Sequence, residues 1–219
     1  MSDLANWTAR PFPERKVLEG RYCRLEPLDV ARHGADLWAA MAGADSVWAY
    51  LPASAPKDRA EYEALLASMV QNKDICPFAV IVDGEAKGHM WMMEIRPAHG
   101  VFEVGWITYS PSLQRTPAAT EAVYLIGEYG FSLGYRRYEW KCNNRNEPSK
   151  RAALRFGFQY EGLFRQHQVV KGENRDTAWY SIIDGEWPAR KAAFERWLAI
   201  ANFDAQGRQK VSLSALNAG

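Results

Sequence analysis

The sequence predicts an α/β (α+β) fold in which a mixed, mostly antiparallel sheet of about seven strands is flanked by helices. Segments with strand and helix periodicity follow one another as strand, two helices, three strands, helix, strand, helix and two strands. Turn signals between neighbouring strands, of which Asp83-Gly84 is the clearest, indicate antiparallel hairpins. We expect a single domain over residues 21–201, preceded by a proline-bearing N-terminal arm (1–20) and followed by a polar, loosely attached tail (202–219).

The individual elements follow from local patterns. Strands are expected where apolar and polar residues alternate or where short apolar runs end at turns, over residues 21–27, 77–82, 87–95, 103–109, 137–143, 158–170 and 175–183. Helices are expected where apolar residues recur at helical spacing, over residues 30–41, 58–71, 117–133, 148–156 and 187–201. Asp29 and Asp58 are suited to cap two of these helices, and Gly134 is suited to end a third.

Composition narrows the class of protein. Lysine and arginine total 27 against 26 aspartate and glutamate, so no basic field predicts a nucleic-acid partner. No apolar run approaches the roughly 18 residues of a membrane span, and the N-terminal residues lack the basic and apolar regions of a signal peptide. The three cysteines and four histidines show no metal-binding spacing, and we expect reduced thiols and histidines at the surface or at strand edges. These features predict a cytoplasmic protein with no metal and no membrane partner.

Aromatic residues are the candidates for a ligand-binding surface. The sequence has nine tryptophans, and Trp48 and Tyr50 lie in a loop over residues 44–56 that prolines break. Such a loop is equally typical of the edge of a core and of the wall of a ligand cleft. We predict that Trp48, Tyr50, Trp91 and Trp106 form the wall of a ligand-binding cleft. The strand end at residues 164–170 is expected to form another part of that wall.

The most informative stretch of the sequence covers residues 103–122. It begins as a strand, breaks at Ser110-Pro111, and restarts as a helix with Thr116 as N-cap and Pro117 at the first helical position. A helix N-terminus beside small residues presents unpaired N–H groups and favours a phosphate group. An ordinary strand-to-helix connection is the alternative reading of this stretch taken alone.

Two motifs carry a resemblance to a known family. The segment Gln114-x-x-Pro117-x-Ala119 resembles the acyl-CoA-binding motif of the GNAT N-acetyltransferases, which reads glutamine or arginine, two residues, glycine, one residue, and glycine or alanine. Asn146-x-x-Ser149, followed by glycine and phenylalanine at 157–158, resembles the second signature of that superfamily.

Two further strings, at residues 103–107 and 174–181, look like the RimJ/RimL-type branch. The similarity covers roughly residues 21–183. It implies acetyl-CoA as the co-substrate, bound in a sheet that opens beside the strand over residues 103–109.

The resemblance also implies the residues that bind the cofactor. The strand backbone at Ile107, Thr108 and Tyr109 would pair with the pantetheine arm. The start of the helix would hold the pyrophosphate through Gln114, Arg115, Thr116, Ala118, Ala119 and Thr120. Asn146 and Ser149 of the second signature would contact the pantetheine or the thiol. One departure stands out, because Pro117 replaces the family's glycine and lacks the N–H that could bind a phosphate. We expect the neighbouring amides to remain available. For Asn146 we favour a contact with the pantetheine amide over a role as a helix cap.

Catalysis in this family needs a base for the acceptor amine and an acid for the departing thiolate. Glu103 lies eleven residues before Gln114, as does the strand glutamate that serves as base in some members, and Glu94 is a rival. Burial in an aromatic cleft would raise the pKa of Glu103 towards neutrality. The position of the family's usual tyrosine acid is Ala153 here. Ser149, one helical turn earlier, is our candidate for the group that stabilises the thiolate, with a structural role as the alternative.

The sequence therefore predicts an acetyl-CoA-dependent N-acetyltransferase. Its acceptor is an amine, either the N-terminal α-amine of a protein or peptide or a small aminoacyl compound or antibiotic. A catalytically weak acyl-CoA-binding or interaction module is the rival reading, which Pro117 and the missing tyrosine permit. The oligomeric state stays open, with a homodimer among the alternatives.

Overall fold

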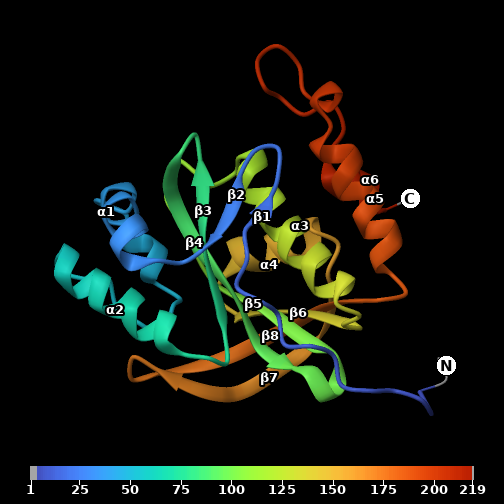
Figure 1. The fold of residues 1–219 in the computed structure, drawn as a ribbon, viewed down its shortest axis with the longest axis horizontal. Coiled ribbons are helices and arrows are strands. Elements are labelled where there is room, and N and C mark those ends of the chain that lie inside the picture. Colours follow the sequence, from blue (N-terminus) through green and yellow to red (C-terminus); the bar gives the residue numbers. More distant parts are fainter. Residues whose placement is uncertain (1–3, 219) are drawn as a thin grey trace.

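The computed structural model describes residues 4–218, which form one eight-stranded sheet with helices on both faces (Figure 1). The strands are β1 (Leu18–Glu19), β2 (Arg24–Pro27), β3 (Cys76–Val82), β4 (Glu85–Arg96), β5 (Val101–Tyr109), β6 (Arg137–Asn143), β7 (Gln159–Val170) and β8 (Glu173–Ile183). The helices are α1 (Val30–Ala40), α2 (Arg59–Gln71), α3 (Pro117–Ser132), α4 (Glu147–Arg155), α5 (Trp187–Leu198) and α6 (Leu213–Asn217). Three short 3₁₀ turns complete the chain: η1 (Asp45–Trp48), η2 (Pro97–His99) and η3 (Ile200–Asn202).

The strands lie in the order β1-β2-β3-β4-β5-β6-β8-β7. Every neighbouring pair is antiparallel except β5 and β6, which are parallel over a short stretch. The predicted mixed, mostly antiparallel sheet is confirmed. The strand beyond the expected seven is β1, a two-residue strand inside the N-terminal arm that pairs with β2.

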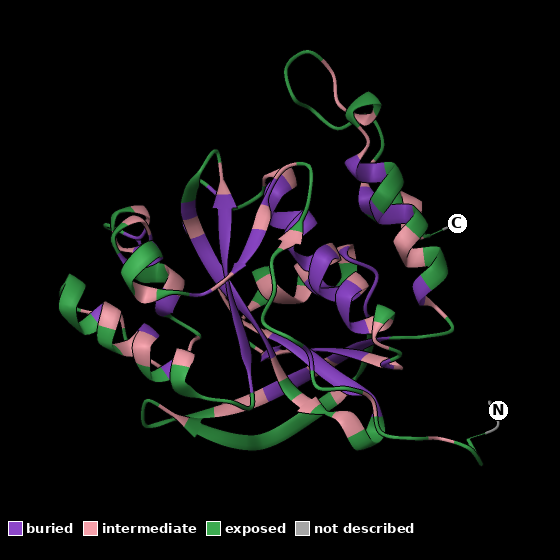
Figure 2. Ribbon diagram, viewed as in Figure 1, coloured by how far each residue is buried: buried purple, intermediate pink, exposed green. Residues whose placement is uncertain are grey.

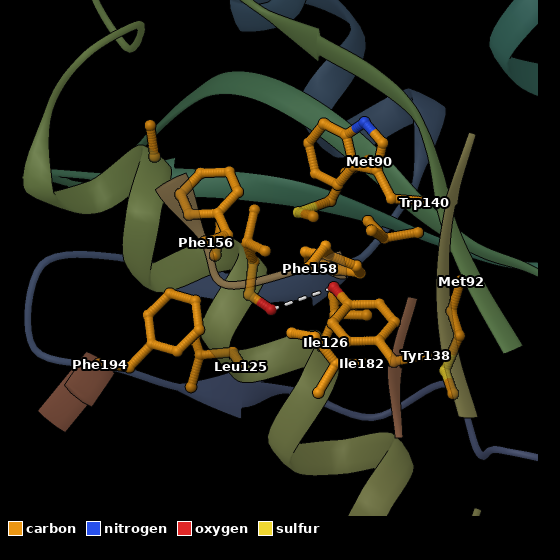
Figure 3. Close-up of a cluster of buried hydrophobic side chains, with 14 of the residues drawn as sticks. Met90, Met92, Leu125, Ile126, Tyr138, Trp140, Phe156, Phe158, Ile182 and Phe194 are labelled. Carbon is orange, nitrogen blue, oxygen red and sulfur yellow. Dashed lines mark hydrogen bonds between the residues drawn. The ribbon is translucent and has the colours of Figure 1, made fainter. Parts of the chain in front are cut away.

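Side-chain alternation along the central strands builds two cores, one on each face of the sheet. In β3, Phe78 and Val80 pack towards α3, whereas Ala79 and Ile81 pack towards α1 and α2. Figure 2 shows β3 and β5 buried, while β7 at the sheet edge is exposed along most of its length. Figure 3 shows the larger core beneath α3, in which the Tyr138 hydroxyl donates a hydrogen bond to the Val123 carbonyl.

The C-terminal segment is folded onto the domain, so the expected loose attachment is wrong. Leu213 on α6 is fully buried in the core cluster. The side-chain amide of Asn217 donates to the carbonyl of Arg155 at the end of α4, and Arg190 on α5 donates to the carbonyl of Asn217. The short apolar segment of α6 escaped prediction because a single buried leucine gives no periodic pattern.

Two of the histidines expected at the surface are buried, namely His33 and His89. His33 is paired with Glu26, but both ring nitrogens of His89 lack a hydrogen-bond partner within residues 4–218. The ring of His89 lies in an aromatic row with Tyr62 and Trp91. Burial lowers the pKa of His89 to about 3 from its ordinary value of 6.5.

His89 therefore makes stability depend on pH. Between its folded pKa of about 3 and 6.5 the unfolded chain binds more protons than the native one, so stability falls as the pH falls. We expect the wild-type protein to lose roughly 2–5 kcal/mol more than His89→Phe between pH 6.5 and 3. Urea unfolding of both proteins at a series of pH values measures the difference, and parallel curves would contradict it.

Candidate active site

The site is built where β5 and β6 separate. The two strands are paired only from Val101 to Glu103 on β5, and beyond that point the edge of β5 faces a gap. A β-bulge at Trp106, whose φ is +47°, lies in β5 just past the separation. Thr108 pairs with His89 of β4, and because successive residues of a strand present their N–H and C=O groups to opposite sides, Ile107 and Tyr109 present theirs to the gap.

Gln114, the first residue of the acyl-CoA motif, does not reach into the gap as a free side chain. Its amide Nε2 donates to the carbonyl of Tyr109 at 2.9 Å. This bond ties the loop after β5 to the strand edge. It fixes the direction in which the loop approaches α3.

The start of α3 presents fewer free amides than the sequence suggested. Thr116 caps the helix as expected, and its hydroxyl accepts from the amide of Ala119 at 3.2 Å. The amides of Thr116 and Thr120 donate to backbone carbonyls. Within residues 4–218, this leaves the amides of Arg115 and Ala118 without a partner. Arg115 has a φ of +64°, in the left-handed region that non-glycine residues seldom adopt, which places its free amide just ahead of the helix start.

A cleft of about 800 Å³ opens beside the free edge of β5 and the start of α3. Its lining includes Ile107, Tyr109, Gln114, Arg115, Pro117, Ala119 and Thr120, together with three residues of α4, Arg151, Ala152 and Arg155. A second, smaller hollow of about 250 Å³ holds Glu103 and Trp106. The two are parts of one cleft, because Val47, Tyr50, Ile107, Trp140, Asn146 and Ser149 line both.

Ser149 and Asn146 lie at this junction. The indole N–H of Trp140 donates to the Ser149 hydroxyl at 3.0 Å, which leaves the hydroxyl proton for another acceptor. Asn146 is the N-cap of α4, and its side-chain oxygen accepts from the Ser149 amide at 3.1 Å. The preference for a pantetheine contact over a cap was therefore wrong for this oxygen, because the first turn of α4 needs an acceptor. The Asn146 side-chain NH₂ has no partner within residues 4–218.

Glu103 is buried, with 6% of its surface exposed, at the end of the smaller hollow. Burial raises its pKa to about 7, although the ammonium of Lys141 lies 2.7 Å from its carboxylate and opposes the rise. Glu139 and Glu94 add to the rise through charge repulsion. Glu103 is thus a carboxylate that exchanges a proton near neutral pH. Glu94, the rival candidate, also lines the hollow but is exposed.

The predicted aromatic wall is half right. Tyr50 and Trp106 line the cleft, and the hydroxyl of Tyr50 donates to the carbonyl of Arg145 across it. Trp48 and Trp91, each 4% exposed, do not line it. Trp48 packs edge-on against Tyr62 in the core, and Trp91 stacks behind Trp106 with ring centroids 4.6 Å apart. These two rings therefore support the wall from inside the core.

The side chains of Thr108, Thr116 and Ala118 also point away from the cleft. Thr108 is fully buried, and Ala118 packs in the main core. Of these three residues, Ala118 offers a ligand its backbone amide, whereas Thr108 pairs with β4 and the Thr116 amide donates to the Leu113 carbonyl. Ala119 and Thr120 do line the wide part of the cleft, where the Thr120 hydroxyl accepts from the Arg155 guanidinium at 3.0 Å.

Several residues at the site were missed. Lys141 is at the site because its strand, β6, pairs in parallel with β5. Trp140 is at the site because its indole donates to Ser149. His167, expected at the surface, is exposed yet lines the smaller hollow with Gln168, Arg175 and Thr177. A bulge in β7 between Phe164 and Gln168 produces this arrangement. Alternation along the sequence cannot reveal a bulge, so no signal pointed to Arg175 or Thr177. His167 and Gln168, in contrast, lie in the strand end at residues 164–170 that was expected to form part of the wall.

Among residues 4–218, no cluster of three or more histidine, cysteine or acidic side chains is arranged to hold a metal ion. In the same range, no helix has the length and apolar character needed to span a membrane.

A family model described as an acetyltransferase (GNAT) domain matches residues 23–159. The chain belongs to the GNAT family. An uncharacterized N-acetyltransferase of Bacillus subtilis, YnaD, is 32% identical over 101 residues, which cover 46% of this chain and 58% of the relative. The chain spans about half the length of the curated relatives it matches first.

Solved structures agree with the GNAT fold. A GCN5-related N-acetyltransferase from Brucella melitensis is 51% identical, with a TM-score of 0.95 over 97% of this chain and 99% of the other. RimL, titled a ribosomal L7/L12 alpha-N-protein acetyltransferase, has a TM-score of 0.65 at 19% identity, over 76% of this chain and 93% of RimL. At that identity the likeness to RimL shows the fold alone.

The cleft of this GNAT domain fits acetyl-CoA. Two orphaned amides at Arg115 and Ala118 lie at the N-terminus of α3, where the helix dipole favours a phosphate. Arg115, Arg151 and Arg155 add positive charge along the same wall. The edge of β5 at Ile107 and the amide of Tyr109 face the gap and offer hydrogen bonds to an extended amide chain, while the Tyr109 carbonyl accepts from Gln114.

Proposed function

We propose that this chain is an acetyl-CoA-dependent N-acetyltransferase that acetylates a primary amine, with Glu103 as general base. The observation that carries the proposal is the position of Glu103. It is a buried carboxylate with a pKa of about 7 in the narrow end of a cleft whose wide end suits a phosphate-bearing ligand. A base that titrates near the working pH both accepts a proton and remains available to do so.

In this proposal, the wide part of the cleft holds acetyl-CoA. The amides of Arg115 and Ala118 bind the pyrophosphate, with charge from Arg115, Arg151 and Arg155. The β5 edge at Ile107 and Tyr109 pairs with the pantetheine arm, and the free amide NH₂ of Asn146 adds a donor. Gln114, Thr116, Ala119 and Thr120 act indirectly, since their polar groups shape the loop and the helix start.

The bound thioester supplies an activated acetyl group. Glu103 takes the proton that the amine loses as its N–C bond forms, directly or through a water molecule. The Ser149 hydroxyl, which accepts a hydrogen bond from Trp140, donates to the sulfur and stabilises the thiolate as the C–S bond breaks. The sulfur leaves as a thiolate and takes a proton from solvent, and Glu103 returns its proton to solvent. The amine has then gained the acetyl group, CoA is released as the thiol, and charge and protons balance.

The acceptor enters from the smaller hollow, where Tyr50 and Trp106 form the wall. Acceptors of two kinds suit an amine-acetylating site: the N-terminal α-amine of a protein or peptide, and a small aminoacyl compound or antibiotic. We also propose a cytoplasmic location, where acetyl-CoA is available. A homodimer is compatible with the exposed edge strand β7.

The test is a screen of primary amines, amino acids and N-terminal peptides that follows CoA release and detects the acetylated product by mass. We expect release that depends on the amine. A weak acyl-CoA-binding module would instead bind acetyl-CoA in a calorimeter and release no CoA with any amine.

Pro117 offers a prediction about cofactor affinity. Pro117→Gly restores the amide that the family's glycine provides, at a position with no intrahelical acceptor. We expect the Kd for CoA to fall by about 3- to 10-fold, since one added hydrogen bond to a charged group is worth about 1 kcal/mol or more. Calorimetry measures the affinity. Pro117→Ala is the matched control, because it adds the amide with less backbone freedom, and unchanged affinity in both variants would contradict the prediction.

Ser149 offers a prediction about the leaving thiolate. Ser149→Ala removes the hydroxyl that Trp140 orients and leaves the Asn146 cap intact, since the cap uses the backbone amide. We expect kcat to fall by about 10- to 100-fold with little change in protein stability. Steady-state kinetics on the best amine test it, and Ser149→Cys, which keeps a weak donor, should recover part of the loss. Wild-type kinetics in Ser149→Ala would leave the residue structural.

A further inference from the structure

One cation in the acceptor hollow has no anionic partner. Arg175 on β8 lines the hollow together with Glu103, and it is half-buried. Its Nε donates to the Thr177 hydroxyl at 3.2 Å. Within residues 4–218, no carboxylate lies within ion-pair distance of its guanidinium. Burial lowers the pKa of Arg175, and the charge of Glu103 in the same hollow partly opposes this shift.

The neighbouring charges are already matched or point elsewhere. Lys141 is paired with Glu103 at 2.7 Å, and Glu139 is held by Lys141 and by arginines of β4 and β6. Asp176, next to Arg175 in the sequence, accepts from the Gln166 amide and from Asn174. Within residues 4–218, Arg175 is therefore the positive charge of the hollow that has no ion-pair partner, and the exposed Glu94 at the rim has none either.

Arg175 is also held in position. The Thr177 hydroxyl is fully buried and contacts both Arg175 Nε and, at 3.0 Å, the ring of His167. This anchor leaves the two terminal nitrogens of the guanidinium to meet a ligand. A guanidinium presents two parallel N–H donors that match a carboxylate.

We propose that the acceptor is a small α-amino acid whose carboxylate is bound by Arg175 while its amine is held next to Glu103. The inference rests on the proposed acetyltransferase function and specifies its substrate class. A volume of about 250 Å³ is below the roughly 300 Å³ at which pockets for drug-sized ligands begin, so the hollow suits a molecule of amino-acid size. The N-terminal residue of a peptide lacks the free carboxylate that Arg175 would bind.

A matched pair of substrates tests the inference, namely a free amino acid and its primary amide, chosen from the side chain most active in the acceptor screen. The amide has the more acidic ammonium group, because it lacks the neighbouring carboxylate, and so has more free amine at pH 7.5. An enzyme that does not recognise the carboxylate would therefore favour the amide. We expect kcat/KM for the free acid to exceed that for the amide by about 10-fold or more. A preference for the amide or for N-terminal peptides would overturn the inference and leave the acetyltransferase function standing.

Variants of Arg175 test whether this side chain produces the preference for the free acid. In Arg175→Gln, kcat/KM for the free acid should fall by about 10- to 100-fold while that for the amide changes little, with an unchanged KM for acetyl-CoA. Arg175→Lys should keep part of the preference. Arg165→Gln, on the exposed strand β7 outside the cleft, is the control and should behave as wild type. A rise in the acetyl-CoA KM with no change in acid preference would assign Arg175 to the cofactor and overturn the proposal.

A binding measurement on the wild-type protein tests the inference without requiring that the variants fold. In the presence of CoA, the free amino acid should raise the thermal midpoint and its amide should not. Equal shifts would contradict the inference. An absence of acetylation with every amine would instead contradict the proposed function itself.

Discussion

Replacing Glu103 by glutamine should lower kcat/KM for the best acceptor by about 10²- to 10⁴-fold, the range expected for loss of a general base. The substitution keeps the shape of the side chain and removes the proton acceptor. Since the pKa of Glu103 is raised to about 7, wild-type kcat/KM should show an acidic limb that falls away below pH 7, in addition to the titration of the amine itself. The glutamine variant should lack this limb and show only the titration of the amine itself.

Two further variants check the assignment. Lys141 holds the pKa of Glu103 down, so Lys141→Gln should move the limb to higher pH. Glu94→Gln removes the rival carboxylate and one source of repulsion, so it should move the limb slightly to lower pH and reduce the rate little. A wild-type pH profile in Glu103→Gln would dismiss Glu103 as the base.

Replacing Glu121 by alanine should destabilise the protein by about 3–5 kcal/mol, the largest effect we expect on folding. Glu121 is a residue of α3 with 4% of its surface exposed. Its carboxylate accepts from the amides of Arg21, Tyr22 and Cys23, at 2.8, 2.6 and 2.8 Å. Removing it leaves three donors unpaired at the entry to β2.

Urea unfolding measures the loss. Glu128→Ala, which removes a more exposed glutamate of the same helix that contacts Lys191 and Trp187, is the matched control and should cost about 1 kcal/mol. An equal loss in the two variants would contradict the account. The contact also explains Gly20, because a Cβ at that position would lie 2.4 Å from the Glu121 carboxylate.

The order and type of the elements could be predicted because their signals are local. Asp29, Asp58 and Thr116 each cap the helix that their sequence context indicated. The buried position of Glu103 followed from its place in an apolar strand beside aromatic residues. The GNAT family followed from two motifs with the correct spacing, and the family match confirms it.

What failed depended on tertiary packing. Trp48 and Trp91 look like Tyr50 and Trp106 in sequence, and only the three-dimensional contacts separate core rings from cleft rings. The side chain of Gln114 closes a loop because the Tyr109 carbonyl has no strand partner where β5 and β6 diverge.

Arg175, the proposed carboxylate-binding residue, was also missed from the sequence. It enters the hollow beside bulges in β7 that no alternation pattern reveals. In the structure Asp176 is occupied by the backbone of β7 and by Asn174. The free charge of Arg175 is therefore a result of tertiary structure and not of neighbouring sequence.

The central claim is direct transfer of an acetyl group from acetyl-CoA to an amine by this chain. Its most direct test is the mass spectrum of protein and amine after incubation of the purified protein with isotopically labelled acetyl-CoA and the panel of amines. The account predicts a labelled N-acetyl product that depends on the wild-type protein, is nearly absent with Glu103→Gln, and leaves the protein itself unlabelled. Binding of acetyl-CoA without a labelled product from any amine would contradict it.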